Sequence, residues 1–250
     1  MARLTHTLDR LFDAALALVY PQGCAACGVR GVERRADWPA CSACWAATRL
    51  FDGDETLCWK CGAPAGGEVP EEVRPTVRCR RCEGEGFKAA RACGLYEGAL
   101  RAAVLGLKSE PFVPPRLAGL LCGAARRAPL DAATLVVPVP LHPSRERERG
   151  FNQATLLASA LAGSARLRLD PLSLARVAHG ERHRAGMDAR ARRESVEGVF
   201  AVTRPRLVRG ERVLLVDDVF TTGATVSACA AALRSAGALE VYVLTAARAA

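Results

Sequence analysis

The sequence predicts an α/β domain built on a parallel sheet, preceded by a small domain rich in cysteine. Eight of the eleven Cys residues form four C-x-x-C pairs within the first third of the 250-residue chain. From Phe87 onward, Val-rich segments alternate with Ala- and Leu-rich segments, which is typical of α/β proteins. Val213 to Val216 form a continuous apolar run bounded by charge, as expected of a strand that is buried on both faces of a parallel sheet.

Residues 1–20 are expected to form an amphipathic helix. Their apolar side chains keep a helical spacing: Leu4, Leu8, Leu11, Phe12, Ala15, Leu18 and Val19. Asp13 interrupts the apolar run and no small-residue cleavage site follows, which argues against a secretory signal peptide. No apolar run approaches the ~18–20 residues that span a bilayer. We therefore expect a cytoplasmic protein without membrane insertion, on which this helix docks.

Residues 21–86 are expected to form a domain that binds two zinc ions. The eight candidate ligands are Cys24, Cys27, Cys41, Cys44, Cys58, Cys61, Cys79 and Cys82. C-x-x-C spacing in a chain without a secretory signal indicates zinc, and sites with four thiolates are structural. Gly28 and Gly62 directly follow a pair, where a tight turn needs a left-handed residue. This pattern favours sites formed by the first two and the last two pairs, and the crossed pairing also satisfies it.

Disulfides, redox dithiols and an iron–sulfur cluster are the competing interpretations of these pairs. Four pairs within about 60 residues, without a strand–helix context, do not fit thioredoxin-like chemistry. Cys93, Cys122 and Cys229 stand alone in apolar surroundings and are expected in the core.

The α/β domain is expected to cover residues 87–250. The predicted strands are Ala92–Tyr96, Leu135–Val139, Val213–Asp217 and Val241–Leu244. The predicted helices are Ala99–Leu107, Pro115–Ala125, Asn152–Ala162 and Val226–Ala236. Alternation of this kind implies right-handed crossovers between parallel strands.

The segment after the strand at Val213 has the chemistry of a site for a phosphorylated ribose. Asp217 and Asp218 fall at the carboxyl end of the strand, where open α/β sheets bind ligands, and adjacent carboxylates accept hydrogen bonds from vicinal hydroxyls. The Thr- and Gly-containing turn Thr221–Thr225 then leads into a helix whose positive end favours a phosphate. The simpler alternative is a strand–helix turn in which these residues only cap the helix.

The segment Val213–Thr225 resembles the phosphoribosyl pyrophosphate (PRPP) motif of type I phosphoribosyltransferases. With Leu135–Ala154 and the four Cys pairs, the chain is similar to the ComF family from about Tyr20 to Arg248. The resemblance implies a type I phosphoribosyltransferase fold behind a double zinc ribbon, and Mg²⁺ bound together with PRPP. It also implies that the two Asp residues hold the ribose 2′- and 3′-hydroxyls. The implied loop around the 5′-phosphate consists of Thr221, Thr222, Gly223, Ala224 and Thr225.

The sequence departs from the phosphoribosyltransferase pattern at two positions of this motif. Phe220 is bulkier than the usual aliphatic residue. Thr221 stands where 6-oxopurine enzymes carry Asp, which makes hypoxanthine and guanine unlikely acceptors.

An arginine-rich segment follows the strand at Leu135. The resemblance assigns Arg145 and Arg149 to pyrophosphate binding, a task that suits bidentate guanidinium groups, and assigns Arg147 less firmly. The alternative is a solvated helix start, since Glu146 and Glu148 partly neutralise the run. Asn152 and Gln153 either contact a ligand or begin the next helix. His142 is expected to be a turn residue.

A second basic segment, Arg176–Phe200, resembles the loop that closes over PRPP in this fold. Arg192 matches the family pattern there, whereas Arg184 and Ser195 replace the usual Gln and Asn. The charge distribution supports an anionic ligand in the second part of the chain. Residues 1–93 carry 13 basic and 12 acidic side chains, a net +1 of the total +9, so the remaining residues carry +8.

Three functions are open at this point. The first is a phosphoribosyltransferase that releases pyrophosphate from Mg²⁺-bound PRPP. The second is an accessory protein that handles single-stranded DNA in natural transformation together with other DNA-uptake proteins. Its candidate stacking residues are Trp38, Trp45 and Trp59. The third is a regulator that senses PRPP without turnover. The sequence leaves the acceptor and the oligomeric state open.

Overall fold

The computed structural model describes residues 22–82, 84–177 and 198–249. The helix predicted for residues 1–20 lies outside these ranges, as do Arg184, Arg192 and Ser195 of the second basic segment. None of the helices in the described part of the chain combines the length and the apolar character that a bilayer span requires.

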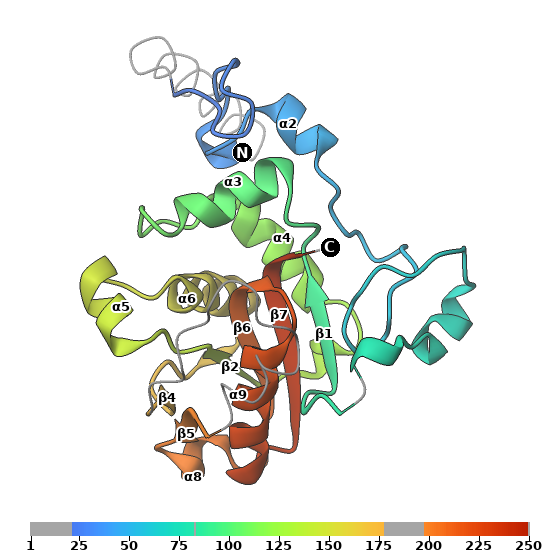
Figure 1. The fold of residues 1–250 in the computed structure, drawn as a ribbon, viewed down its shortest axis with the longest axis vertical. Coiled ribbons are helices and arrows are strands. Elements are labelled where there is room, and N and C mark those ends of the chain that lie inside the picture. The colour runs from blue at the N-terminus through green and yellow to red at the C-terminus, as the bar shows by residue number, and fades with distance from the viewer. Residues whose placement is uncertain (1–21, 83, 178–197, 250) are drawn as a thin grey trace, which may run out of the picture.

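A five-stranded parallel sheet forms the centre of the larger domain (Figure 1). Its strands are, in spatial order, β1 (Ala89–Ala92), β7 (Glu240–Arg248), β6 (Arg212–Phe220), β2 (Leu135–Pro138) and β3 (Arg168–Leu169). A separate antiparallel ribbon pairs β4 (Leu174–Arg176) with β5 (Phe200–Val202). The last strand of the chain, β7, therefore lies between the first strand and β6.

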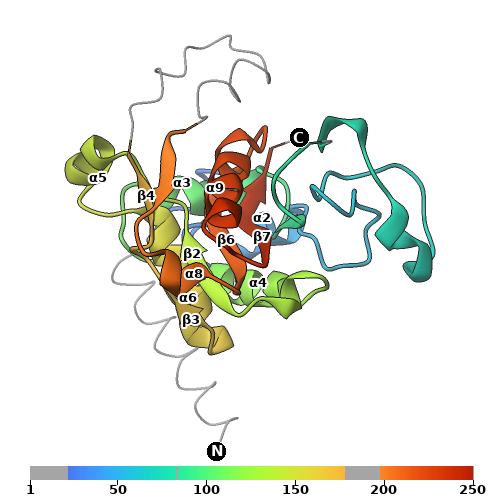
Figure 2. The same cartoon turned by 90° about the horizontal axis from the view of Figure 1, so that it is seen from below.

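Helices cover both faces of the sheet (Figure 2). One face packs against α3 (Gly98–Gly106), α4 (Pro115–Ala125) and α6 (Gln153–Ala165), and the other against α9 (Ala224–Ser235). The side chains of β6 alternate between the two cores: Leu214 and Val216 face the first, whereas Val213 and Leu215 face the second. This alternation explains the continuous apolar run, because a strand with two covered faces needs apolar residues at every position.

The shorter helices connect the strands or belong to the Cys-rich part. They are α2 (Ser42–Ala47), α5 (Pro143–Arg149) and α8 (Pro205–Val208), with 3₁₀ turns at Arg35–Asp37, Glu71–Thr76, Arg80–Cys82 and Leu130–Ala132. The three lone thiols Cys93, Cys122 and Cys229 are buried in the two cores, as predicted.

The predicted elements are present with one displaced strand. The helix predicted at Pro115–Ala125 has the observed bounds, and the strand predicted at Leu135 is β2. The strand expected near Ala92–Tyr96 begins earlier: β1 ends at Ala92, and beyond it Leu95 forms an isolated parallel bridge to Arg248 of β7. The sequence of β1 contains a charged residue, Arg91, whose buried guanidinium Nη1 donates to the carbonyl oxygen of Trp59 over 2.8 Å. This tertiary contact, which the sequence pattern does not reveal, makes a charged residue acceptable in the strand.

Candidate functional site

The eight thiols of the C-x-x-C pairs form two four-cysteine clusters. One joins Cys24, Cys27, Cys41 and Cys44, and the other joins Cys58, Cys61, Cys79 and Cys82, with the ligand atoms of each cluster within 4.8 Å of one another. The first two C-x-x-C pairs thus form one site and the last two form the other, which is the arrangement that the sequence favoured. The Sγ–Sγ distances of 3.7 Å (Cys24–Cys44) and 3.6 Å (Cys58–Cys82) fit zinc. Four sulfurs at ~2.3 Å from one tetrahedral ion lie about 3.8 Å apart.

The two clusters repeat the same local structure. In each, the sulfur of the first Cys accepts a hydrogen bond from the backbone N–H of the third: Cys41 to Cys24 over 3.2 Å, and Cys79 to Cys58 over 3.3 Å. Burial opposes ionisation of Cys24, but backbone N–H groups outweigh it and lower the pKa of this thiol to about 6. The same balance lowers the pKa of Cys58 to about 6. Backbone donors thus favour the thiolate form of the first Cys in each cluster. The neighbouring thiols raise the pKa of Cys44, burial raises the pKa of Cys61 and Cys82, and a metal ion would supply the charge that stabilises their thiolates.

Asp217 and Asp218 lie where the neighbouring strand β2 has ended. The pairing of β2 with β6 stops at Pro138 and Val216, whereas β7 accompanies β6 as far as Phe220 and Arg248. The strand therefore runs three residues further than the predicted end at Asp217. The two carboxylates are nevertheless at the carboxyl edge of the sheet on the β2 side, as expected for a ligand site.

The environments of the two carboxylates differ. Burial, and then the charge of Asp218, raises the pKa of Asp217 well above its ordinary value. The Oδ1 atom of Asp217 accepts from the backbone N–H of Asp218 over 2.8 Å. Oδ1 of Asp218 accepts from the N–H of Val219 over 2.7 Å, and its Oδ2 from Nε2 of Gln153 over 3.3 Å. A dihydroxyl ligand would supply donors to this crowded pair.

The turn after β6 places a glycine where only glycine fits. Gly223 has φ +83°, and a Cβ atom there would lie 2.8 Å from Cζ of Phe220. Thr221 is exposed, Thr222 and Thr225 are half-buried, and α9 begins at Ala224. The predicted phosphate loop thus leads directly into the N-terminal end of a 12-residue helix, which is a favourable position for a phosphate.

Helix α5 separates the three arginines of the predicted pyrophosphate segment. Arg145 and Arg149 are four residues apart and share one face, whereas Arg147 points about 200° away from Arg145. The side chain of Arg149 donates to Oε1 of Gln153, whose amide donates to Asp218. One chain of hydrogen bonds thus connects the arginine segment to the Asp pair.

The neighbouring polar residues have distinct positions. Asn152 caps α6 through the N–H of Ala154 and donates to the carbonyl oxygen of Val139 over 3.0 Å. Asn152 is therefore the N-cap of the helix, whereas Gln153, its first residue, contacts Asp218 of the candidate site. His142 accepts from the N–H of Ser144 at the start of α5, as expected of a turn residue.

Arg176 is a functional candidate that sequence reasoning missed. It is the last residue of β4, and its guanidinium carbon lies 5.6 Å from the ring centroid of Phe200 on β5. Its Nε is buried and has no hydrogen-bond partner among the residues that the structure describes. Burial, and then the charge of Arg145, lowers the pKa of Arg176. A buried guanidinium donor that feels the charge of a second guanidinium group favours a bound anion. In the sequence, Arg176 is one basic residue among many.

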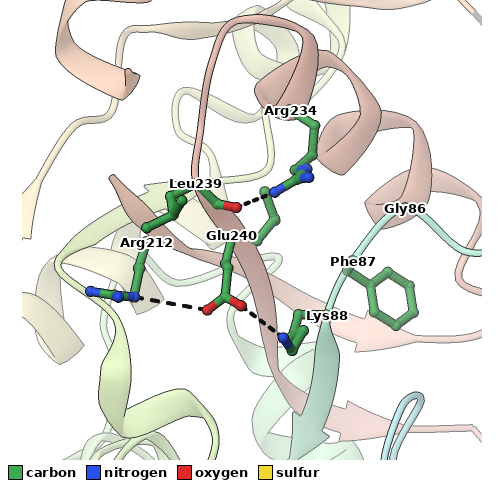
Figure 3. A pocket seen from close by; sticks show the side chains of 8 residues that line it. Gly86, Phe87, Lys88, Arg212, Arg234, Leu239 and Glu240 are labelled. Atoms are coloured by element: carbon green, nitrogen blue, oxygen red, sulfur yellow. Dashed lines mark hydrogen bonds and ion pairs between the residues drawn. The ribbon is translucent and has the colours of Figure 1, made fainter. Parts of the chain in front are cut away.

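A hollow of about 540 Å³ lies at the opposite end of the strands, where β1, β6 and β7 begin (Figure 3). Its charged groups bind one another: Nζ of Lys88 lies 2.8 Å and Nε of Arg212 lies 3.8 Å from the Glu240 carboxylate. Arg234 donates to the carbonyl oxygen of Leu239. We therefore regard this cluster as a structural contact between β1, β6 and β7 and not as a ligand site.

Comparison with known proteins agrees with this geometry. The Double zinc ribbon domain family matches residues 15–83, and the Phosphoribosyl transferase domain family matches residues 148–250. DNA utilization protein YhgH of Salmonella typhi is 33% identical over 215 residues, which cover 82% of this chain and 88% of that protein. Competence protein F of Haemophilus influenzae is 38% identical over 57% of this chain and 64% of its own length. Competence protein ComFC of Bacillus subtilis is 32% identical over 43% and 41%.

These matches define the class as a phosphoribosyltransferase-like domain joined to a double zinc ribbon. The chain belongs to the ComF family. Among solved structures, the glutamine PRPP amidotransferase of B. subtilis matches with a TM-score of 0.37 and 20% identity, over 56% of this chain and 30% of that chain.

Proposed function

We propose that this protein binds Mg²⁺-PRPP at the carboxyl edge of its sheet and transfers the phosphoribosyl group to an acceptor. The observation that carries the proposal is the hydrogen-bonded chain from Arg149 through Gln153 to Asp218. It connects groups suited to a pyrophosphate with groups suited to the ribose. The phosphate loop at the N-terminal end of α9 supplies the third part of the site.

In the proposed reaction a nucleophile attacks C1 of the ribose, the C1–O bond breaks, and pyrophosphate leaves with the bonding electrons. Asp217 and Asp218 hold the 2′- and 3′-hydroxyls, and residues 221–225 hold the 5′-phosphate. Arg145 and Arg149, joined by Arg176, bind the leaving group and stabilise its developing charge. The contribution of the protein is positioning and electrostatics. Mg²⁺ bound to the pyrophosphate oxygens would neutralise part of their charge.

Calorimetric titration of the zinc-loaded protein with Mg²⁺-PRPP tests the binding step. Each hydrogen bond to a charged group contributes ~1.5–3 kcal/mol, so the double variant Asp217→Asn/Asp218→Asn should bind PRPP at least about 100-fold more weakly. Arg145→Gln/Arg149→Gln should also weaken binding, whereas Arg147→Gln on the other face of α5 should not. Equal effects of these two arginine variants would contradict the assigned geometry.

Turnover is tested separately, by pyrophosphate release from Mg²⁺-PRPP in the presence of a panel of acceptors. Release that the Asp double variant lacks would support the transferase. PRPP binding without release for any acceptor would instead favour a PRPP-sensing regulator.

The names of the relatives favour a second candidate, a role in DNA handling. The structure reduces the number of Trp residues that are available to stack on DNA bases. Trp45 is buried, so the prediction that it stacks on bases was wrong, and Trp38 lies 6.3 Å from the ring of Phe112. The guanidinium carbon of Arg91 lies over the ring of Trp59, 4.7 Å from its centroid. Salt-dependent binding of single-stranded DNA that Trp59→Ala weakens would support this role, and absence of binding at low salt would exclude it.

A further inference from the structure

The two four-cysteine clusters belong to different cores. Cys24 and Cys41 pack in the core that contains α3 and α4. Cys58, Cys61 and Cys82 pack in the core that contains Phe220 and the buried face of α9. The second cluster, defined here by Cys58, Cys61, Cys79 and Cys82, is therefore part of the packing that supports the phosphate loop, and the first cluster is not.

The turn of the second cluster contacts the edge strand β1 directly. The backbone N–H of Ala90 donates to the carbonyl oxygen of Lys60 over 2.7 Å. Arg91 reaches the carbonyl oxygen of Trp59 over 2.8 Å. A Cβ atom on Gly62 would lie 2.6 Å from the carbonyl oxygen of Ala90, so the two backbones touch. The turn cannot move without moving β1.

Arg248 connects the same turn to the residue that precedes the phosphate loop. Its Nη1 donates to the carbonyl oxygen of Cys61 over 2.6 Å, and Nη2 lies 3.9 Å from the Cys61 sulfur. Its guanidinium carbon lies 4.5 Å from the ring centroid of Phe220, its register partner on β6. The backbone N–H of Arg248 donates to the carbonyl oxygen of Gly94 over 2.9 Å, which fixes the main chain from which this side chain extends.

The Phe220 ring connects Arg248 with Gly223 of the phosphate loop. It contacts the guanidinium group of Arg248 and packs edge-to-face against Phe87, whose ring centroid is 6.0 Å away. A Cβ atom on Gly223 would lie 2.8 Å from Cζ of Phe220, so the ring leaves no room for a methyl group there. A ring held at three points fixes the left-handed turn at Gly223. A ring free to rotate would leave that turn without its support.

We propose that Arg248 is a positioning residue through which the metal-bound second cluster fixes the phosphate loop, whereas the first cluster leaves it unaffected. The PRPP consequences rest on the proposed function; the mechanical link does not. Because coupling between two binding sites is reciprocal, PRPP should raise the zinc affinity of the second cluster by the same factor by which zinc there tightens PRPP binding.

The test uses Arg248→Met, which keeps the aliphatic stem and removes the guanidinium group. The matched control is Arg91→Met, because Arg91 also bonds a carbonyl of this turn and stacks on an aromatic ring, but does not contact Phe220. Arg248→Lys, which keeps the charge but loses the planar group, serves if the Met variant fails to fold. Each variant is prepared zinc-loaded, and its zinc content is measured.

Three readouts follow. Amide hydrogen exchange at residues 221–225 should become about tenfold faster in Arg248→Met and Arg248→Lys and stay unchanged in Arg91→Met. The Kd for Mg²⁺-PRPP should rise about tenfold in the Arg248 variants only. In competition titrations against a colorimetric chelator, PRPP should raise the zinc affinity of one of the two clusters in the wild type and of neither cluster in Arg248→Met.

The outcomes separate the two proposals. If the wild-type protein does not bind PRPP, the proposed function is refuted. Faster amide exchange at residues 221–225 in the Arg248 variants, but not in Arg91→Met, would still support the mechanical link. Equal exchange in the Arg248 and Arg91 variants would overturn the positioning role, whatever the PRPP affinity.

Discussion

Two glycines offer a matched test of how the second cluster is attached to the sheet. Gly28 and Gly62 occupy equivalent turns with φ +70° and +71°. A Cβ atom on Gly28 would meet nothing within 4 Å, whereas one on Gly62 would lie 2.6 Å from the carbonyl oxygen of Ala90. Alanine in the left-handed region costs ~1–2 kcal/mol at either position. The contact with β1 should add ~1–3 kcal/mol for Gly62→Ala alone, as overpacking does elsewhere.

The assay is thermal unfolding of the zinc-loaded proteins, with the zinc content measured before and after. In a chain of this length, 1 kcal/mol shifts the midpoint by roughly 2–4 °C. Gly28→Ala should therefore lower it by about 2–8 °C, and Gly62→Ala by several degrees more. A larger loss in Gly28→Ala, or equal losses in both, would refute the inference that the second cluster docks on β1 through this turn.

Three further predictions concern the site and the first cluster. Gly223→Ala should lower the unfolding midpoint and weaken PRPP binding. Adding Phe220→Leu should partly restore the midpoint by removing the 2.8 Å clash, while binding stays weak because Leu lacks the ring that Arg248 holds; no recovery of the midpoint would place the strain elsewhere. Asp217→Asn should move stability and binding in opposite directions. Because the pKa of Asp217 is raised in the folded state, its ionised form destabilises the protein as pH rises above the unfolded value, and Asn removes that penalty. The variant should melt higher near pH 7 while binding PRPP more weakly, and a lower midpoint would contradict the pKa shift. Arg116→Met should cost about 2 kcal/mol, because it leaves the buried carboxylate of Asp37 without its 3.0 Å partner. An unchanged midpoint in chemical denaturation would show that the ion pair makes no net contribution to the free energy of unfolding.

The parts of the site that the sequence could predict are those encoded by short spacing. The C-x-x-C pairs predict metal ligands locally, because ligands three residues apart reach one ion wherever the turn lies. Which two pairs share an ion is decided by the fold, since the sequence left the crossed pairing open. The position of the Asp pair was likewise predictable, because the continuous apolar run of a strand buried on both faces shows where its carboxyl end lies. The domain boundaries, the cytoplasmic location and the roles of the site residues stay predictions.

The parts that could not be predicted depend on contacts between distant segments. Gln153 reads as an ordinary helix start, and only the fold places its amide beside Asp218, 65 residues later. Arg176 becomes distinctive only in the fold, where its Nε is buried and finds no hydrogen-bond partner within the described part of the chain. Trp45 seemed available for stacking, but its indole donates to the carbonyl oxygen of Asp37 inside the first core. In each case the local pattern allows two roles, and the tertiary surroundings decide between them.

The strand order explains why the second cluster can influence the PRPP motif at all. The edge strand β1, on which the cluster docks, pairs with β7, and β7 pairs with β6, which carries the Asp pair and Phe220. The last strand of the chain is therefore the element that joins the Cys-rich segment to the candidate site, and Arg248 is its final residue. The bond from Arg248 to Cys61 spans 187 residues. Contacts of such high sequence separation form only after long loops have closed, so the phosphate loop gains its support from the Cys-rich segment once β7 has entered the sheet.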